Sequence, residues 1–358
     1  MDAYSGMGEA ARNICKALDV AGVEVVTNIV KNIESTVDLG DNQQLARNKN
    51  NLDLPYNIKI FHTTPDVVRA GMEPMKYHIF HQFWETDKLP QWWVWELNHS
   101  VDEIWTGCEW NKRVFIDSGI NRPVWVCPQP INTDIPEGKK LTIPGQSGFL
   151  FGSMFQWIER KNPKALIQSF CREFDGVSGV SLLIKTYKER FTEQEKDDII
   201  GEMRGWKNEL ELNNPPPVYL IPDIMSKDEI NSFYQTIDCF VSAHRGEGFG
   251  VPIGEAMAAG KPVISTNLGG IHEHVPVEYW YPVGYTIIPV FNMNWTPWYG
   301  PDQNWADVNQ DQLQQRMRYV FEHQEEAKNK GLRAKKFISN ALSYETVGKK
   351  MKERLLHI

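Results

Sequence analysis

The residues best suited to chemistry lie together in one stretch of the C-terminal half, HRGEGFGVPIGEAMAAGKPVISTNLGG (244–270). Gly246, Gly248 and Gly250 permit close backbone approach by a ligand, and Pro252 suits the first turn of a helix. A glycine loop that leads into a helix presents free N–H groups and the positive end of the helix dipole, and both favour an anion. The stretch therefore predicts a binding turn for a nucleoside diphosphate at the end of a parallel strand.

Two carboxylates, Glu247 and Glu255, flank the predicted turn with seven residues between them. Because a carboxylate repels phosphate, neither should face the diphosphate, but both can accept hydrogen bonds from the hydroxyls of a sugar or ribose. The alternatives are a solvated loop carboxylate for Glu247 and a dipole-stabilising helix residue for Glu255. The glycine-rich context favours the binding role for both.

Regularly alternating strands and helices must position this turn. Short apolar runs predict buried strands at 148–152, 180–184, 218–221, 238–242 and 262–265. Helical patterns fall between or after them, at 162–174, 193–209, 226–235 and 251–259. Ser226 and Glu229 have the spacing of a capping box at the start of the third helix. This order predicts a parallel sheet with helices on both faces.

The N-terminal half follows a similar but less regular pattern. It predicts a helix over 8–19, an irregular stretch over 32–54, and strands at 23–26, 57–62, 77–81, 102–105 and 124–127. The predicted fold class is therefore α/β, with two parallel-sheet domains and a boundary in the Pro- and Gly-rich stretch 128–147. The predicted units are 1–135, 136–330 and a terminal helical segment over 331–358.

The two glutamates, set within EGFG-x-P-x-x-EA-x-A-x-GKPVI, resemble the signature of retaining GT-B glycosyltransferases of family four. Other segments resemble the same family in the same order, and W-E-T-D is typical of one subgroup. These segments are FLFGSMFQWIERKNPKALIQSFCREF (149–174), the W-E-T-D-x-L-P stretch within 83–115, and two C-terminal helices over 304–321 and 343–351. The resemblance implies two Rossmann-like domains with a donor and acceptor cleft between them. It also implies a last helix that crosses back onto the N-terminal domain.

The resemblance assigns roles to individual residues. It implies that Glu255 binds the ribose of a nucleoside-diphosphate sugar and that Glu247 contacts the transferred sugar. It implies that Lys161 binds the diphosphate, with Arg160 beside it. A fixed cation suits a leaving group that gains negative charge. The remaining donor-side residues belong to the glycine loop and the start of its helix: Gly248, Phe249, Gly250 and Val251.

The sequence departs from the family pattern in two places. Ser153 stands where many members carry an arginine, and Lys185, at the end of strand 180–184, is a candidate to replace that cation. The chain also begins inside the first glycine loop, which contains Gly6 and Gly8, so either the N-terminal sheet lacks its first strand or the true start lies upstream. The two glycines would let the backbone approach the donor phosphate or the acceptor.

The candidates for a group near the reacting carbon are His62, His81 and Glu85, each near the end of a predicted strand. His81 matches the family's active-site histidine best, and a structural histidine is the alternative. The resemblance implies that the acceptor hydroxyl attacks the sugar from the same face that the phosphate leaves, and that the leaving phosphate helps to deprotonate this hydroxyl. Because no D-x-D triplet occurs, neither a metal nor another cofactor is expected.

The net charge of −8 argues against tight, sequence-independent nucleic-acid binding. The segment 328–354 nevertheless holds nine basic and two acidic residues, so its interpretations are a solvated helix face or weak contact with an anionic membrane surface. Five scattered cysteines, with no C-x-x-C pair, predict reduced thiols in a cytoplasmic protein. No run of apolar residues suggests a signal peptide or a membrane span.

The sequence leaves the acceptor open: a glycan, a lipid-linked glycan or a modified nucleic acid. One alternative function is a viral-type transferase that acts on hydroxymethylated DNA bases. The other is a non-catalytic module that only binds a sugar nucleotide. The intact Glu247, Glu255 and Lys161 set favours an enzyme over a module.

Overall fold

The apolar runs of the N-terminal half pair as a parallel sheet in the computed structural model, which describes residues 6–27, 55–136 and 138–358. The sheet order is β1-β2-β3-β4, formed by Ile58–Phe61, Tyr77–His81, Glu103–Thr106 and Val124–Val126. The helices of this domain are α1 (Gly6–Val20), the short α3 (Pro65–Val68), α4 (Gln91–Ser100) and α5 (Glu109–Asp117). Its core is aromatic, with Phe80, Trp84, Trp93 and Phe115 nearly or fully buried.

The strand predicted over 23–26 is wrong. After α1 the amide of Val23 donates to the carbonyl of Leu18 and the amide of Gly22 to that of Asp19, so the chain leaves the helix through a turn. Residues 23–27 then follow as irregular chain, with Val23 and Val25 packed against the core. The predicted irregular stretch 32–54 and the first five residues lie outside the described residues.

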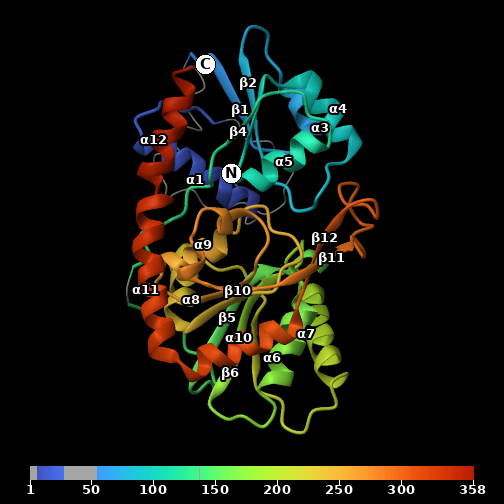
Figure 1. The fold of residues 1–358 in the computed structure, drawn as a ribbon, viewed down its shortest axis with the longest axis vertical. Helices are drawn as coiled ribbons and strands as arrows, with labels where there is room; N and C mark the ends of the chain where they lie inside the picture. The colour runs from blue at the N-terminus through green and yellow to red at the C-terminus, as the bar shows by residue number, and fades with distance from the viewer. Residues whose placement is uncertain (1–5, 28–54, 137) are drawn as a thin grey trace.

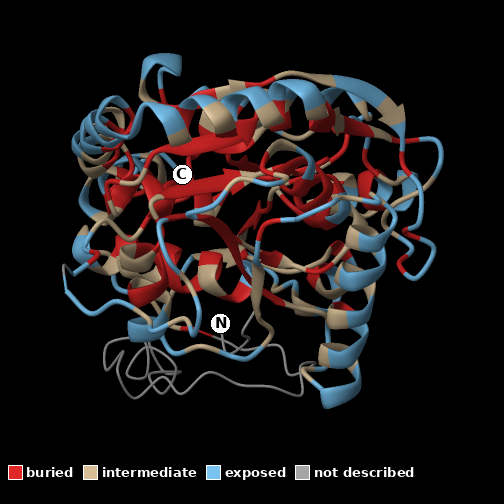
Figure 2. Cartoon of the chain, turned by 90° about the horizontal axis from the view of Figure 1, so that it is seen from below, coloured by how far each residue is buried: buried red, intermediate tan, exposed pale blue. Residues whose placement is uncertain are grey.

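The C-terminal half forms a six-stranded parallel sheet in the order β10-β9-β8-β5-β6-β7. Its strands are β5 (Phe149–Gln156), β6 (Val180–Tyr187), β7 (Val218–Ile221), β8 (Cys239–Ser242), β9 (Val263–Thr266) and β10 (Tyr281–Val283). The helices are α6 (Pro163–Glu173), α7 (Glu193–Asn208), α8 (Lys227–Thr236), α9 (Val251–Ala258) and α10 (Gln310–Glu322). The capping box of Ser226 and Glu229 is confirmed at the start of α8. The two α/β domains lie one above the other (Figure 1), with buried strands enclosed by helices whose outer faces are exposed (Figure 2).

The helix predicted from residue 304 begins later, because 304–308 is a strand. β12 (Asn304–Val308) pairs antiparallel with β11 (Tyr285–Pro289), and the partner strand supplies the hydrogen bonds that a helix would otherwise form internally. Asn309 then caps α10 by accepting from the amide of Gln312. We call β11, β12 and the loop between them the hairpin (285–308).

Two terminal helices run along both domains (Figure 1). α11 (Gln324–Ala341) packs against α9 of the C-terminal domain, and α12 (Tyr344–Leu355) packs against α1 of the N-terminal domain. Tyr344 donates to Asn13 Oδ1 at 2.8 Å, and Lys352 donates to the carbonyl of Ala21 at 2.8 Å. The chain therefore ends on the domain in which it began. Within the described residues, no helix has the length and apolar character needed to cross a bilayer.

Candidate active site

The predicted anion-binding turn is a left-handed turn at the start of α9. Gly250 precedes the helix with φ of 96° and ψ of 48°, a conformation that L side chains rarely adopt. Pro252 occupies the first turn of α9, and Val251 is its first residue. The turn follows β8, which lies near the middle of the six-stranded sheet. The N-terminus of α9 is thus presented at the carboxyl end of a parallel strand, where such sheets bind ligands.

Lys161 and Glu247 form a buried ion pair beside this turn. Lys161 ends a short 3-10 turn after β5, Glu247 lies in the loop after β8, and their charged ends are in direct contact. Their side chains keep only 14% and 17% of their exposure. Burial alone would raise the pKa of Glu247, but Lys161 and Arg160 outweigh it and lower the pKa to about 2. Glu247 is therefore ionised at neutral pH.

Arg160 points to the interface between the domains. Its Nη1 donates to the carbonyl of Gly246 at 2.9 Å and lies 3.5 Å from Glu85 Oε1 of the N-terminal domain. Its Nε is buried and has no hydrogen-bond partner among the described residues. Burial opposes its charge, but Glu85, Tyr299 and Glu247 together outweigh burial and raise the pKa of Arg160. Arg160 and Lys161, adjacent in sequence, therefore hold different carboxylates.

Glu255 is enclosed by two partners that the sequence did not predict. Its carboxylate accepts a hydrogen bond from Tyr234 at 3.0 Å and an ion pair from Lys227 at 2.8 Å, and it is only 4% exposed. Lys227 also lies 3.3 Å from Glu9, in the first turn of α1. A lysine at the first position of a helix carries no sequence signal for this contact, because both carboxylates are remote in the chain.

The glycine pair Gly6 and Gly8 comes to the same side of the site. Gly6 opens α1 and Gly8 is buried within its first turn. Glu9 follows directly and makes the contact with Lys227 described above. The structure therefore places the start of α1 next to the Glu255 end of the candidate site.

Two of the three loop glycines serve the other domain. A Cβ at Gly246 would lie 2.2 Å from the carbonyl oxygen of Glu85, and one at Gly248 would lie 2.6 Å from Cβ of Phe83. Close approach of the N-terminal domain therefore leaves no room for a side chain at these positions. The ring of Phe249, between Gly248 and Gly250, packs against that of Phe83 with the ring centres 5.7 Å apart and the planes tilted by 43°.

His81 lies behind Phe83 and is paired with a second histidine. The Nδ1 atoms of His62 and His81 are 3.0 Å apart, and His62 Nδ1 is also 2.9 Å from the carbonyl of His81. The ring of His81 is fully buried and that of His62 is half-buried. Burial lowers the pKa of His62 to about 4 and that of His81 well below its usual range. Their Nε2 atoms have no hydrogen-bond partner among the described residues. The ring of His81 meets Phe83 edge-on at 5.1 Å, which connects it to Phe249 of the donor loop.

Ser153 and Lys185 lie along the sheet. Ser153 stands in place of the family's arginine, and Lys185 is the candidate to replace that cation. The Ser153 hydroxyl donates to the carbonyl of Val241 at 2.6 Å inside the sheet. Lys185 pairs in register with Met154, and its Nζ lies 4.9 Å from the ring centre of Tyr187. Burial lowers the pKa of Lys185 to about 8. The structure joins neither side chain to the Lys161–Glu247 pair.

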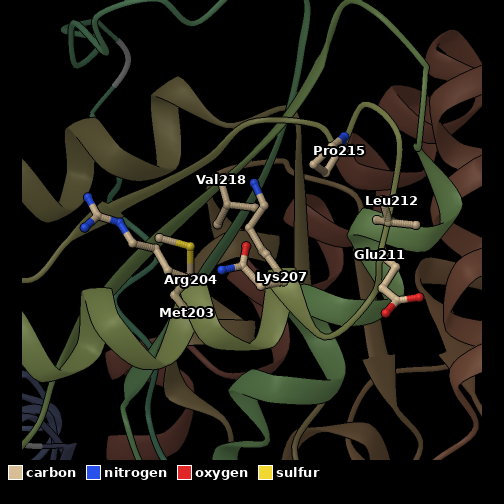
Figure 3. Close-up of a pocket in the computed structure, with 8 residues that line it drawn as sticks. Met203, Arg204, Lys207, Glu211, Leu212, Pro215 and Val218 are labelled. Carbon is tan, nitrogen blue, oxygen red and sulfur yellow. The ribbon is translucent and has the colours of Figure 1, made fainter.

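A groove of about 620 Å³ lies on the outer side of the C-terminal domain (Figure 3). It is formed by α7 and the chain over 211–218, with Met203, Lys207 and Leu212 among its lining residues. None of the predicted site residues lines it. The candidate site is therefore defined by its side-chain contacts and not by this groove.

Comparison with known proteins supports the interpretation of the fold. The family model described as glycosyl transferases group 1 matches residues 157–281, about a third of the chain, which include Lys161, Glu247 and Glu255. In sequence, no curated protein matches significantly.

Solved structures resemble most or all of the chain. HepE of Anabaena, in complex with UDP and glucose, has a TM-score of 0.68 at 15% identity and covers 100% of this chain and 98% of its own. Sucrose-phosphate synthase from Thermosynechococcus elongatus gives 0.67 at 12% identity, with 99% and 93% covered. A TarM variant of S. aureus gives 0.62 at 13% identity, covering 83% of this chain but only 54% of TarM.

These findings define the class of protein. The two parallel-sheet domains have the GT-B fold, and the group 1 match over the candidate site supports a glycosyltransferase. The assignment to family four, the retention of configuration and the roles of the individual site residues stay predictions.

Proposed function

We propose that this protein is a retaining, metal-independent glycosyltransferase that moves a sugar from a nucleoside-diphosphate sugar to an acceptor hydroxyl. One observation carries the proposal: the buried Lys161–Glu247 pair lies beside the N-terminus of α9, which also bears Glu255, where the two domains meet. An anion site flanked by two carboxylates suits a ligand that is charged in the middle and carries hydroxyls at both ends.

The Lys161–Glu247 pair suits exchange with the donor. A diphosphate would take Lys161 as its counter-ion, and Glu247 would then accept hydrogen bonds from hydroxyls of the transferred sugar. Its pKa of about 2 keeps it an acceptor throughout the neutral range. Because the leaving diphosphate gains charge as its bond to the sugar breaks, Lys161 would stabilise the transition state more than the ground state.

The proposed step breaks the bond between the sugar's anomeric carbon and the leaving phosphate oxygen, and forms a bond from that carbon to the acceptor oxygen. The acceptor's proton passes to the leaving diphosphate on the same face, so configuration is retained. His81 is proposed as a neutral hydrogen-bond donor to the sugar, because burial disfavours its charged form.

Metal independence rests on the positive charge already built into the site. Lys161, Arg160 and the N-terminus of α9 can neutralise a diphosphate together. Full activity in EDTA is the expected result. Loss of activity that Mg²⁺ or Mn²⁺ restores would overturn this part of the proposal.

A thermal-shift panel of UDP-, GDP-, ADP- and CDP-sugars tests donor use, with UDP-glucose first because HepE is seen with UDP-glucose. A donor at a hundredfold excess over Kd should stabilise the fold by about 2.7 kcal/mol. Release of nucleoside diphosphate then separates an enzyme from a binding module. Binding without release under any acceptor would favour the module. A cytoplasmic location with weak membrane contact through the basic segment 328–354 belongs to the same proposal.

A further inference from the structure

The W-E-T-D segment is held along its length by the hairpin of the other domain. Each residue from Trp84 to Lys88 has a partner within 299–304. Trp84 stacks on Tyr299 at 5.3 Å, Glu85 accepts from Tyr299 at 2.8 Å, Thr86 contacts Gln303 at 3.0 Å, Asp87 accepts from the Asn304 side chain at 2.8 Å, and Lys88 pairs with Asp302 at 2.5 Å. We call residues 84–88 and 299–304 together the clasp. Because its five consecutive contacts differ in chemistry, the clasp fits only this alignment of 84–88 against 299–304.

The hairpin is in turn anchored to the donor loop by Arg245. This side chain pairs with Glu159 at 3.1 Å and with Asp307 of β12 at 3.3 Å. Its guanidinium lies 5.0 Å from the ring centre of Phe291 and 5.8 Å from that of Trp305, both in the hairpin. The amide of Ala306 donates to the carbonyl of Arg245 at 2.8 Å. The hairpin therefore moves with the loop that carries Glu247.

Glu85 is the point at which the clasp meets the candidate site. One carboxylate oxygen accepts from Tyr299, and the other lies 3.5 Å from Arg160. The side chains of Glu85 and Arg160 keep only 19% and 12% of their exposure, so neither charge has water as an adequate substitute partner.

The charges around Arg160 show what Glu85 does. Both Glu85 and Glu247 attract Arg160, and Glu247 is also the partner of Lys161. With Glu85 in place, each cation has its own carboxylate. Without it, a buried Arg160 would turn to Glu247 and compete with Lys161 for it, because an unpaired buried charge is costly.

We propose that Glu85, held by Tyr299, is a positioning residue that keeps Arg160 away from Glu247 and so couples closure of the two domains to the geometry of the donor site. The inference rests on the proposed function for what the site binds. The coupling itself is a property of the protein without ligand, so it can be tested without any donor.

The test uses Tyr299→Phe and Glu85→Gln, with Tyr285→Phe on β11 of the same hairpin as the matched control. In the free protein, amide hydrogen exchange over 245–250 should quicken about tenfold in both variants and not in the control, since a hydrogen bond to a charged group is lost. Unchanged exchange there in Tyr299→Phe would overturn the proposal, even if Glu85→Gln failed to fold.

Kinetics distinguish a positioning role from a merely structural one. We expect kcat to fall about tenfold in Tyr299→Phe. The variant that combines Tyr299→Phe with Glu85→Gln should be no slower than Glu85→Gln alone, because both changes break the same chain of contacts. The proposal would be contradicted if the double variant lost as much kcat as the two single variants combined. It would also be contradicted if kcat fell only as far as the fraction of folded protein falls. If the parent transfers no sugar from any donor, the proposed function fails, while the exchange result still decides the coupling.

Discussion

The ammonium group of Lys161 is in contact with the carboxylate of Glu247, although the two residues follow different strands of the sheet, β5 and β8. Both side chains are more than four-fifths buried. The free protein thus holds the proposed phosphate cation in place with an internal anion. A buried cation that is already partnered and fixed needs little rearrangement when a diphosphate arrives.

Replacement of this lysine should therefore harm turnover more than binding. For Lys161→Ala we expect kcat to fall by about a hundredfold to a thousandfold, corresponding to about 2.7–4 kcal/mol of lost transition-state stabilisation. Steady-state kinetics against the parent measure it. Lys164→Ala is the matched control, because Lys164 is exposed on the next helix and pairs only with exposed Glu209. A raised KM for donor with unchanged kcat would show that Lys161 acts in the ground state alone.

Loss of Glu255 should weaken donor binding while the fold persists. The Glu255→Ala variant removes the charge-assisted hydrogen bond proposed between Glu255 and the ribose, so donor affinity should drop about tenfold to a hundredfold. Lys227 keeps Glu9 as a partner, which limits the damage to the free protein. Titration calorimetry measures the affinity, and Glu353→Ala on the exposed face of α12 is the control. Equal affinity in parent and Glu255→Ala would remove this residue from the donor site.

Acid should destabilise the fold before ordinary carboxylates titrate. Burial lowers the pKa of His62 and of His244 to about 4, whereas an unfolded histidine titrates near 6.5. Between these values the unfolded chain binds more protons, so stability falls as pH falls, by about 1.4 kcal/mol per pH unit for each histidine. Urea unfolding between about pH 7 and pH 5 measures the slope. His62→Gln should reduce it, and exposed His99→Gln should not; a flat profile in the parent would contradict the neutral burial of these rings.

The terminal helix should depend on one glycine. A Cβ at Gly348 of α12 would lie 2.0 Å from the carbonyl oxygen of Ala17 in α1, so Gly348→Ala must separate the two helices. Overpacking of this kind costs about 1–3 kcal/mol of unfolding free energy. Gly205→Ala in α7 meets nothing within 4 Å and should instead stabilise by about 0.4–1 kcal/mol. Denaturant unfolding measures the change in unfolding free energy of each variant, a loss for Gly348→Ala and a gain for Gly205→Ala. If both changed the unfolding free energy equally, helix propensity alone would explain them.

The sequence alone determined the features that depend on neighbouring residues. Strand and helix alternation, the Ser226 capping box and the helix start at Pro252 are all local, since periodicity, caps and proline's fixed backbone angle act within a few positions. The glutamate spacing around this turn likewise identified the candidate donor loop. The strand predicted over 23–26 and the helix predicted from residue 304 were wrong because tertiary context decides the structure of such short segments.

Only the tertiary structure decided which residues share the site. Glu85 reaches Arg160 and Tyr299, and Lys227 joins Glu255 to Glu9, across separations that no local pattern records. The same holds for Gly246, which lies against Glu85 of the other domain. Such contacts come from how two separately patterned sheets pack, and a buried charge takes whichever partner that packing brings within reach.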